Sequence, residues 1–135
     1  ELGCKLVAQK GRRLLKNDTS KKRNTFVDIM VEKGDGDELE RIVLDTKYKK
    51  FVSSDDFSNA DVFQVSTYCL LHNADKAVLI YPRWNKEVPN VPSFKLNTDE
   101  KDIKINFKTI DLCYTNLKQH LEEIRDDIKD ILKVA

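Results

Sequence analysis

Residues 41–49 read Arg-Ile-Val-Leu-Asp-Thr-Lys-Tyr-Lys, so a short branched apolar run leads directly into an acid and a lysine. The apolar residues 42–44 are of the type that a buried strand needs. Side chains two apart on a strand point to the same face, which places the Asp45 carboxylate beside the Lys47 ammonium. Burial of such ions is costly unless they find partners, so the stretch indicates a catalytic pair. The alternative is an edge strand that emerges into solvent with an ordinary surface acid and base.

The composition predicts one folded unit. At 135 residues the chain has the length of a single domain, and we expect residues 1–135 to form one. Charged residues make up 35% of the chain, but the formal net charge is only +1, so the overall charge says little about partners. Lysines and arginines are concentrated in residues 10–23, where they form either a solvated loop or a contact for a phosphate backbone. Because the chain begins with Glu1 and not with methionine, we expect it to be one domain of a longer protein.

The three cysteines argue against a metal centre built on thiolates. Cys4, Cys69 and Cys113 are far apart and form no C-x-x-C or Cys/His cluster, which disfavours a zinc site and an iron–sulfur cluster. They are predicted to be free thiols in a reducing cytosol. No apolar segment approaches the ~20 residues that span a bilayer, and we expect a cytoplasmic protein without membrane contact.

The periodicities predict a mixed sheet with helices. The expected strands are 4–8 and 13–15, for which one irregular helix is the alternative, then 25–31, the run at 42–44, 77–81 and 103–107, and the expected helices are 61–71 and 115–134. Residues 16–24, 51–59 and 83–92 are expected to be loops. The run 77–81 is apolar throughout, which is typical of a central strand covered on both faces. The last helix has one apolar stripe and is expected to be structural.

A tight turn at residues 34–37 joins two of these strands into a hairpin, because glycine and aspartate tolerate positive φ. In an antiparallel pair of strands, the sequence numbers of two residues that face each other add to a constant. A centre between residues 36 and 37 sets Asp28 opposite Asp45, and both would then lie on the face of Lys47. Two carboxylates so close repel each other unless a divalent cation sits between them, and oxygen ligands favour Mg²⁺ or Mn²⁺. A slip of one residue would put the two acids on opposite faces.

Other polar and aromatic residues carry weaker signals. Gln64 and Tyr68 are one turn apart on the predicted helix 61–71. His72 and His120 lack a companion nucleophile or ligand and are interpreted as surface histidines. Trp84 is expected either to fold back over the sheet edge or to contact nucleic acid.

The motifs in order resemble a known family of nucleases. Thr25-x-x-Asp28, residues 45–49, Gln64-x-x-x-Tyr68 and the strand 78–82 follow one another as in the PD-(D/E)XK superfamily. More narrowly they resemble the C-terminal nuclease domain of the McrC family, the cleavage subunits of the McrBC restriction system for 5-methylcytosine DNA. The resemblance implies an α/β (α+β) fold with a restriction-endonuclease-like core, in which helices flank a central mixed sheet of four to five strands.

The resemblance also implies a metal-dependent DNA endonuclease. It assigns metal binding to Asp28, Asp45 and the backbone carbonyl of Thr46, and catalytic roles to the two acids, Lys47, Gln64 and Tyr68. The implied cofactor is Mg²⁺ or Mn²⁺. The implied partners are DNA, an McrB-like GTP-dependent motor subunit and a second copy for double-strand cleavage. Val27 stands where the superfamily name has proline, and the acid found in many members ahead of the first strand is not identified here.

Two other functions agree with the same residues. Gln64 and Tyr68 match a motif of RecB-like nucleases, so a RecB-like or Cas4-like exonuclease is one alternative. A nuclease fold that binds without activity is the other. No P-loop motif is present, so nucleotide-driven translocation and methylcytosine recognition are expected of the partner.

Overall fold

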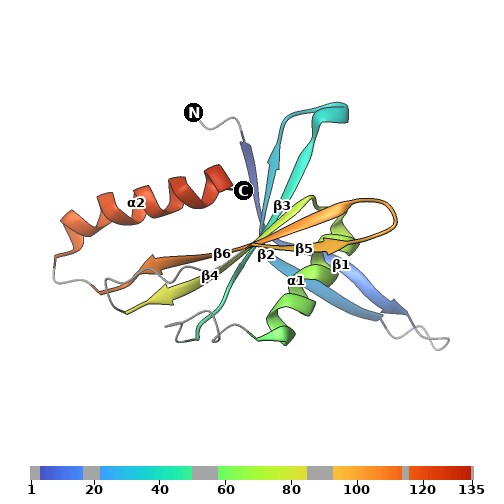
Figure 1. Cartoon of the computed structure of the whole chain (residues 1–135), viewed down its shortest axis with the longest axis horizontal. Helices are drawn as coiled ribbons and strands as arrows, with labels where there is room; N and C mark the ends of the chain where they lie inside the picture. Colours follow the sequence, from blue (N-terminus) through green and yellow to red (C-terminus); the bar gives the residue numbers. More distant parts are fainter. Residues whose placement is uncertain (1–3, 17–21, 50–57, 85–92, 114–115, 135) are drawn as a thin grey trace.

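The structure is a computed structural model that describes residues 4–16, 22–49, 58–84, 93–113 and 116–134. It contains six strands, a short 3-10 turn and two helices (Figure 1). Their bounds are β1 Cys4–Lys16, β2 Lys22–Lys33, η1 Gly36–Glu38, β3 Glu40–Thr46, α1 Asn59–His72, β4 Lys76–Arg83, β5 Phe94–Asn97, β6 Asp102–Asp111 and α2 Leu117–Val134.

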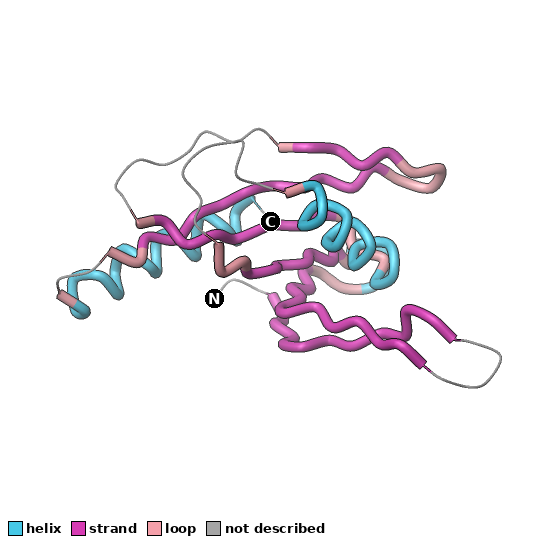
Figure 2. The backbone as a smooth tube through the Cα atoms, turned by 90° about the horizontal axis from the view of Figure 1, so that it is seen from below, coloured by secondary structure: helices cyan, strands magenta, loops and turns pink. Residues whose placement is uncertain are grey.

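All six strands form one mixed sheet in the order β1-β2-β3-β4-β6-β5. The central strands β3, β4 and β6 are parallel, while β1 to β3 and the β5–β6 pair are antiparallel. The helices lie on opposite faces of this sheet (Figure 2). One apolar cluster joins the sheet to Val65, Tyr68 and Cys69 of α1, and the other joins it to Ile131 of α2. The side chains of residues 77–82 in β4 are buried, as a central strand covered on both faces requires.

The predicted fold class is confirmed, but the sheet has six strands instead of four to five. Residues 4–16 form one strand across Gly11 because they pair with β2 over almost their whole length. The same pairing brings residues 22–24, predicted as loop, into β2. Strand β5 was not predicted, since its four residues are mostly exposed and it is defined by pairing with β6. Residues 102–111 form a single strand, because β6 pairs with β4 as far as Asp111.

The first helix matches its prediction closely. The side chain of Ser58 caps α1 by accepting a hydrogen bond from the Asp61 N–H, and Asn73 ends the helix in the left-handed conformation. The interpretation of His72 and His120 as surface residues is wrong, because both are buried. The expected loops 51–59 and 83–92 lie mostly outside the described residues.

The predicted buried stripe of α2 is only partly correct. Ile131 is buried, but Leu121 and Ile128 are 58% and 44% exposed. Of these three residues, only Ile131, near the C-terminal end of α2, belongs to the core. No helix in the described ranges is long and apolar enough to cross a membrane.

The predicted register of the β2–β3 hairpin is confirmed. Ile29 faces Leu44 and Met30 faces Val43, which is the pairing that a centre between residues 36 and 37 predicts. The turn depends on Gly34, whose φ of 76° is one that glycine adopts at low cost. This hairpin fixes where the ends of β2 and β3 lie, and the candidate site is at those ends.

Candidate active site

The Asp45 carboxylate lies at the buried end of β3. Val43, two residues earlier, packs in the apolar cluster beneath α1, so Asp45 points to the α1 face of the sheet. The residue is only 4% exposed. Burial raises the pKa of Asp45, the Lys47 ammonium opposes this, and the charges of Asp28 and Asp61 raise it further. The alternative of an ordinary surface acid on an edge strand is therefore wrong, because β3 is an interior strand.

The Lys47 ammonium is held between Asp45 and α1. Its Nζ atom lies 2.6 Å from Oδ2 of Asp45 and donates a hydrogen bond of 2.6 Å to Oε1 of Gln64. The amide of Gln64 in turn donates to the Tyr68 hydroxyl at 2.7 Å. The structure thus brings together four of the predicted residues, Asp45, Lys47, Gln64 and Tyr68, in one connected chain. The Lys47 side chain is 11% exposed, which leaves it access to solvent.

Asp28 is not paired with Asp45 in the β2–β3 ladder, as the hairpin register had predicted, but contacts Thr46. Its Oδ2 atom accepts hydrogen bonds from the backbone N–H of Thr46 at 3.1 Å and from the Thr46 hydroxyl at 3.0 Å. The ladder between β2 and β3 begins at Ile29, one residue short of Asp28. Asp28 is exposed, yet its charge reaches Asp45 strongly enough to raise the pKa of that carboxyl. The two acids therefore lie at the same end of the hairpin, where Asp28 is hydrogen-bonded to the residue that follows Asp45.

An irregularity in β2 explains the position of Asp28. Val27 and Met30 both pack in the cluster beneath α1, although regular alternation would send them to opposite faces. On the neighbouring strand β1, Gln9 has a φ of 49° and pairing resumes on either side of it. Such local breaks re-aim side chains and are common next to active sites. A break of this kind cannot be read from the hydrophobic pattern, because Asp28 is polar in either register.

Three further residues complete the site and were not predicted. Asp61, in the first turn of α1, is 5% exposed, and its carboxylate accepts hydrogen bonds from Lys49 at 2.8 and 2.9 Å and from the Tyr81 hydroxyl at 3.1 Å. Its Oδ1 atom is 4.0 Å from Nζ of Lys47. Burial alone would raise the pKa of Asp61, but the hydrogen bonds from Lys49, Tyr81 and Ser58 outweigh burial and lower it. Burial also raises the pKa of Tyr81.

A sequence signal for Asp61 did exist. Asp61, Gln64 and Tyr68 are at positions i, i+3 and i+7 of α1 and so share one side of the helix. Tyr81 follows Leu79 by two residues on β4, which puts its side chain on the same face of the sheet as Asp45. The spacing alone is equally typical of a core stripe, so it needed the structure to single out these residues.

The residues present fit a divalent cation through Asp45. The Oδ2 atom of Asp45 is buried and lies 2.6 Å from Nζ of Lys47. A buried carboxylate near the charges of two other acids, Asp28 and Asp61, is stabilised by a nearby cation. Among the described residues no group of three or more histidine, cysteine and acidic side chains could hold a metal. A cation here would depend on Asp28, Asp45 and backbone or substrate oxygens, which is a ligand set that Mg²⁺ accepts.

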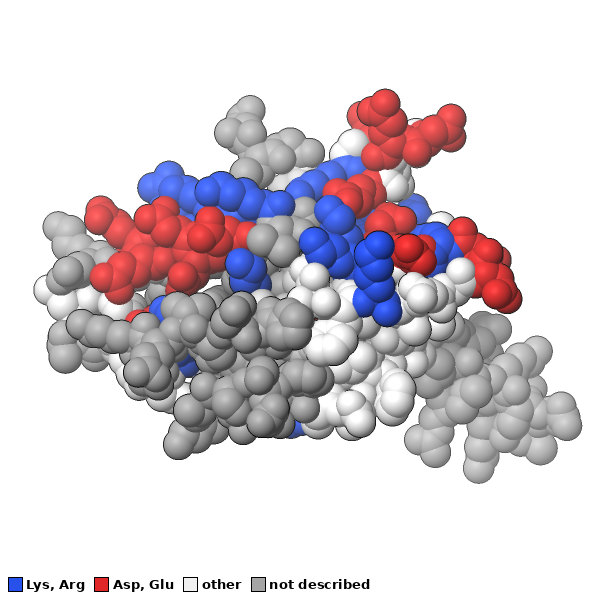
Figure 3. Space-filling view, viewed as in Figure 1, with Lys and Arg blue, Asp and Glu red and all other residues white. Residues whose placement is uncertain are grey.

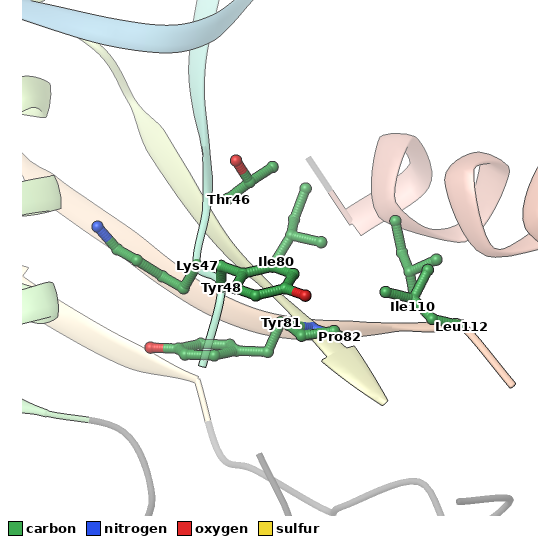
Figure 4. Close-up of a pocket in the computed structure, with 8 residues that line it drawn as sticks. All are labelled: Thr46, Lys47, Tyr48, Ile80, Tyr81, Pro82, Ile110 and Leu112. Carbon is green, nitrogen blue, oxygen red and sulfur yellow. The ribbon is translucent and has the colours of Figure 1, made fainter. Parts of the chain in front are cut away.

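A cavity of about 230 Å³ lies on the other side of β3 (Figure 4). In this view the Lys47 and Tyr81 side chains extend to one side of the strand, while Thr46 and Ile80 point to the other. The cavity is lined by Thr46, Lys47, Tyr48, Ile80, Tyr81, Pro82, Ile110 and Leu112. Its walls are mostly apolar and it does not contain the carboxylates, so the chemistry resides on the α1 side.

The exposed surface of α2 carries charges of both signs. In the view of Figure 3, acidic side chains gather over α2 beside a row of basic ones, and further acidic side chains lie at the tips of hairpins. The exposed acids of α2 include Glu122, Glu123, Asp126 and Asp130, of which the last two pair with Lys129 and Lys133. The charge of this surface therefore does not decide whether it could face a nucleic-acid backbone.

Comparisons with known proteins agree with the resemblance. The family model for "McrBC 5-methylcytosine restriction system component" matches residues 4–82. Among solved structures, a chain of a half-complex from the tetradecameric assembly of Thermococcus gammatolerans McrB AAA+ hexamers with bound McrC matches with a TM-score of 0.51 and 18% identity. The match covers 96% of this chain and 29% of that chain. A search of curated proteins finds no match.

Proposed function

The chain belongs to the McrBC 5-methylcytosine restriction system component family, and on this premise we propose that it is a metal-dependent DNA endonuclease of the PD-(D/E)XK type. The observation that carries the proposal is the Asp45 carboxylate, which is buried at the end of β3, is close enough to feel the charge of Asp28 and lies 2.6 Å from Nζ of Lys47.

Each site residue has a role that follows from its contacts. Asp28 and Asp45, with the Thr46 carbonyl, would hold Mg²⁺ or Mn²⁺. When bound, the cation would supply Lewis acidity, which polarises a phosphodiester and acidifies a water. Lys47, fixed by Gln64, presents its ammonium to the scissile phosphate and stabilises the negative charge that develops during attack. Tyr68 holds the Gln64 amide, so that its carbonyl faces Lys47.

The proposal extends to partners. The matched structure comprises McrB AAA+ hexamers with bound McrC, and we propose an McrB-like GTP-dependent motor as the partner of this chain as well. The motor would supply translocation and methylcytosine recognition. Pairing of two nuclease domains would account for cleavage of both strands. The proposed location is the cytoplasm, where the DNA substrate would be found.

The test is a cleavage assay on closed circular and linear DNA with Mg²⁺, Mn²⁺ or EDTA, with and without the motor subunit, on methylated and unmethylated DNA. We expect cleavage to require the divalent cation and to be lost in Asp45→Asn. Asp126→Asn is the matched control, because this acid is exposed on α2 and pairs with Lys129 there. Equal cleavage by Asp45→Asn and the parent protein would refute the proposal.

One observation favours a second candidate. The chain from Lys47 through Gln64 to Tyr68 is the arrangement expected of the RecB-like motif, so an exonuclease remains the alternative. It predicts degradation of linear DNA and none of closed circles. A binding module without activity predicts no saturable Mn²⁺ site that depends on Asp45.

A further inference from the structure

Asp61 is a buried, hydrogen-bonded acid of the candidate site, and the proposed nuclease function gives it no role. It lies in the first turn of α1, where an acid also favours the helix dipole. An acid that only served the dipole would remain in solvent. The Asp61 side chain instead points inward, is 7% exposed and accepts three hydrogen bonds from two partners, Lys49 and Tyr81.

After Asp45, Asp61 is the next carboxylate near the Lys47 ammonium. Nζ of Lys47 is 2.6 Å from Asp45 and 4.0 Å from Asp61. A divalent cation on Asp45 would repel this ammonium, since two positive charges cannot share one carboxylate without cost. Lys47 then needs another anion within reach, or it must leave the site.

We propose that Asp61 is a positioning residue that retains the Lys47 ammonium in the site when a divalent cation occupies Asp45. This inference rests on the proposed function. Gln64 Oε1 accepts one hydrogen bond from Lys47 but carries no charge, so it cannot replace the lost carboxylate. Tyr81 and Lys49 in turn keep Asp61 ionised and fixed, the first from β4 and the second from the residues that follow β3.

Direct Mn²⁺ binding to four purified proteins tests the inference by a double-mutant cycle. They are the parent, Asp61→Asn, Lys47→Met and the double variant. In the parent background, loss of the Asp61 charge leaves Lys47 with Asp45 as its remaining anion, so lysine and metal compete. We expect Asp61→Asn to weaken Mn²⁺ binding about tenfold in the parent, and less than about twofold when Lys47 is already methionine.

A matched control separates this role from a structural one. Tyr81→Phe removes a neutral hydrogen bond to Asp61 and keeps its charge. We expect both Tyr81→Phe and Asp61→Asn to lower Tm, but only Asp61→Asn to weaken Mn²⁺ binding. The kcat of metal-dependent cleavage should fall in Asp61→Asn at saturating Mn²⁺, with KM for DNA little changed.

Two results would overturn the inference. Unchanged Mn²⁺ affinity in Asp61→Asn would show a structural role alone. Equal weakening in both backgrounds would show that Asp61 acts on the cation directly and not through Lys47. If the parent itself binds no Mn²⁺, the proposed function fails and the inference with it, whereas binding by the parent with either of the two results above refutes the inference alone.

Discussion

Replacement of Asp45 by asparagine should stabilise the protein when no metal is present. Burial raises the pKa of Asp45 above its ordinary value, although Lys47 opposes the change. An acid with a raised pKa in the folded state contributes its full stability below its ordinary pKa, and that stability is lost as the pH rises through the folded value. At pH 7 the ionised carboxylate therefore destabilises the fold, and asparagine removes that charge with little change in shape.

The size of the gain follows from opposing contributions. An unpaired buried carboxylate costs several kcal/mol, but the Lys47 ammonium 2.6 Å away offsets most of that cost. Lys47 keeps Gln64 and Asp61 as partners in the variant, so it is not left alone. We expect a net gain of ~1 kcal/mol in the free energy of unfolding, which for a domain of this size raises Tm by about 4 °C.

The matched control is Asp75→Asn, the same change at an acid whose pKa shifts the other way. Burial alone would raise the pKa of Asp75, but the Arg41 N–H and the Lys101 ammonium outweigh burial and lower it. Stability from such an acid is present above its ordinary pKa and is lost as the pH falls through the folded value. Asp75→Asn should therefore lower Tm at pH 7.

The prediction is tested by measuring the Tm of the parent and of Asp45→Asn, each in EDTA and in saturating Mn²⁺. The parent should gain about 2.7 kcal/mol at a Mn²⁺ concentration of 100 times Kd, and Asp45→Asn should gain little. The order of Tm should thus reverse, with the variant above the parent in EDTA and below it in Mn²⁺. A variant that is less stable than the parent in EDTA at pH 7 would show that the ion pair outweighs burial and would refute the reasoning.

Three other substitutions probe the site and its hairpin. Lys47→Ala should slow cleavage ~100-fold while Mn²⁺ binding, measured by titration, remains. Asp28→Ala should abolish Mn²⁺ binding and lower the free energy of unfolding by ~1 kcal/mol in denaturant titrations, because Thr46 loses the acceptor of two hydrogen bonds; retained binding would exclude Asp28 as a ligand. Gly34→Ala should lower that free energy by ~2 kcal/mol, since φ is 76° and the new Cβ would lie 2.6 Å from the Glu38 carbonyl oxygen; a loss of stability below ~0.5 kcal/mol would contradict the strain argument.

The sequence predicts the centre of this fold better than its edges. The runs 42–44 and 77–81 are apolar throughout, and burial on both faces leaves little choice of structure for such segments. Strand β5 escapes prediction because its four residues are largely exposed and its place in the sheet depends on pairing with β6. Pairing is a non-local property, so hydrophobic periodicity within the segment does not report it.

In the candidate site, too, local sequence rules predict some residues, whereas the positions of others depend on non-local packing. The hairpin turn fixes the register, and alternation along β3 puts Asp45 and Lys47 on one face, so local rules are sufficient for that pair. Asp28 departs from the regular pattern because β2 is irregular where it faces Gln9. Asp61 comes from a helix whose distance from β3 depends on packing, which no spacing within α1 can supply.

These differences bear on how the site works. The Asp45 carboxylate, whose pKa burial raises, is at the end of β3, an interior strand that lies between β2 and β4. Its two charged neighbours come from separate pieces of chain, Lys47 from the end of β3 and Asp61 from α1. A shift of α1 relative to the sheet would thus change the balance of charge around Lys47 without moving Asp45. Since Gln64 and Tyr68 are on the same helix, such a shift would move the Gln64 amide that accepts from Lys47 and the Tyr68 hydroxyl that holds this amide together.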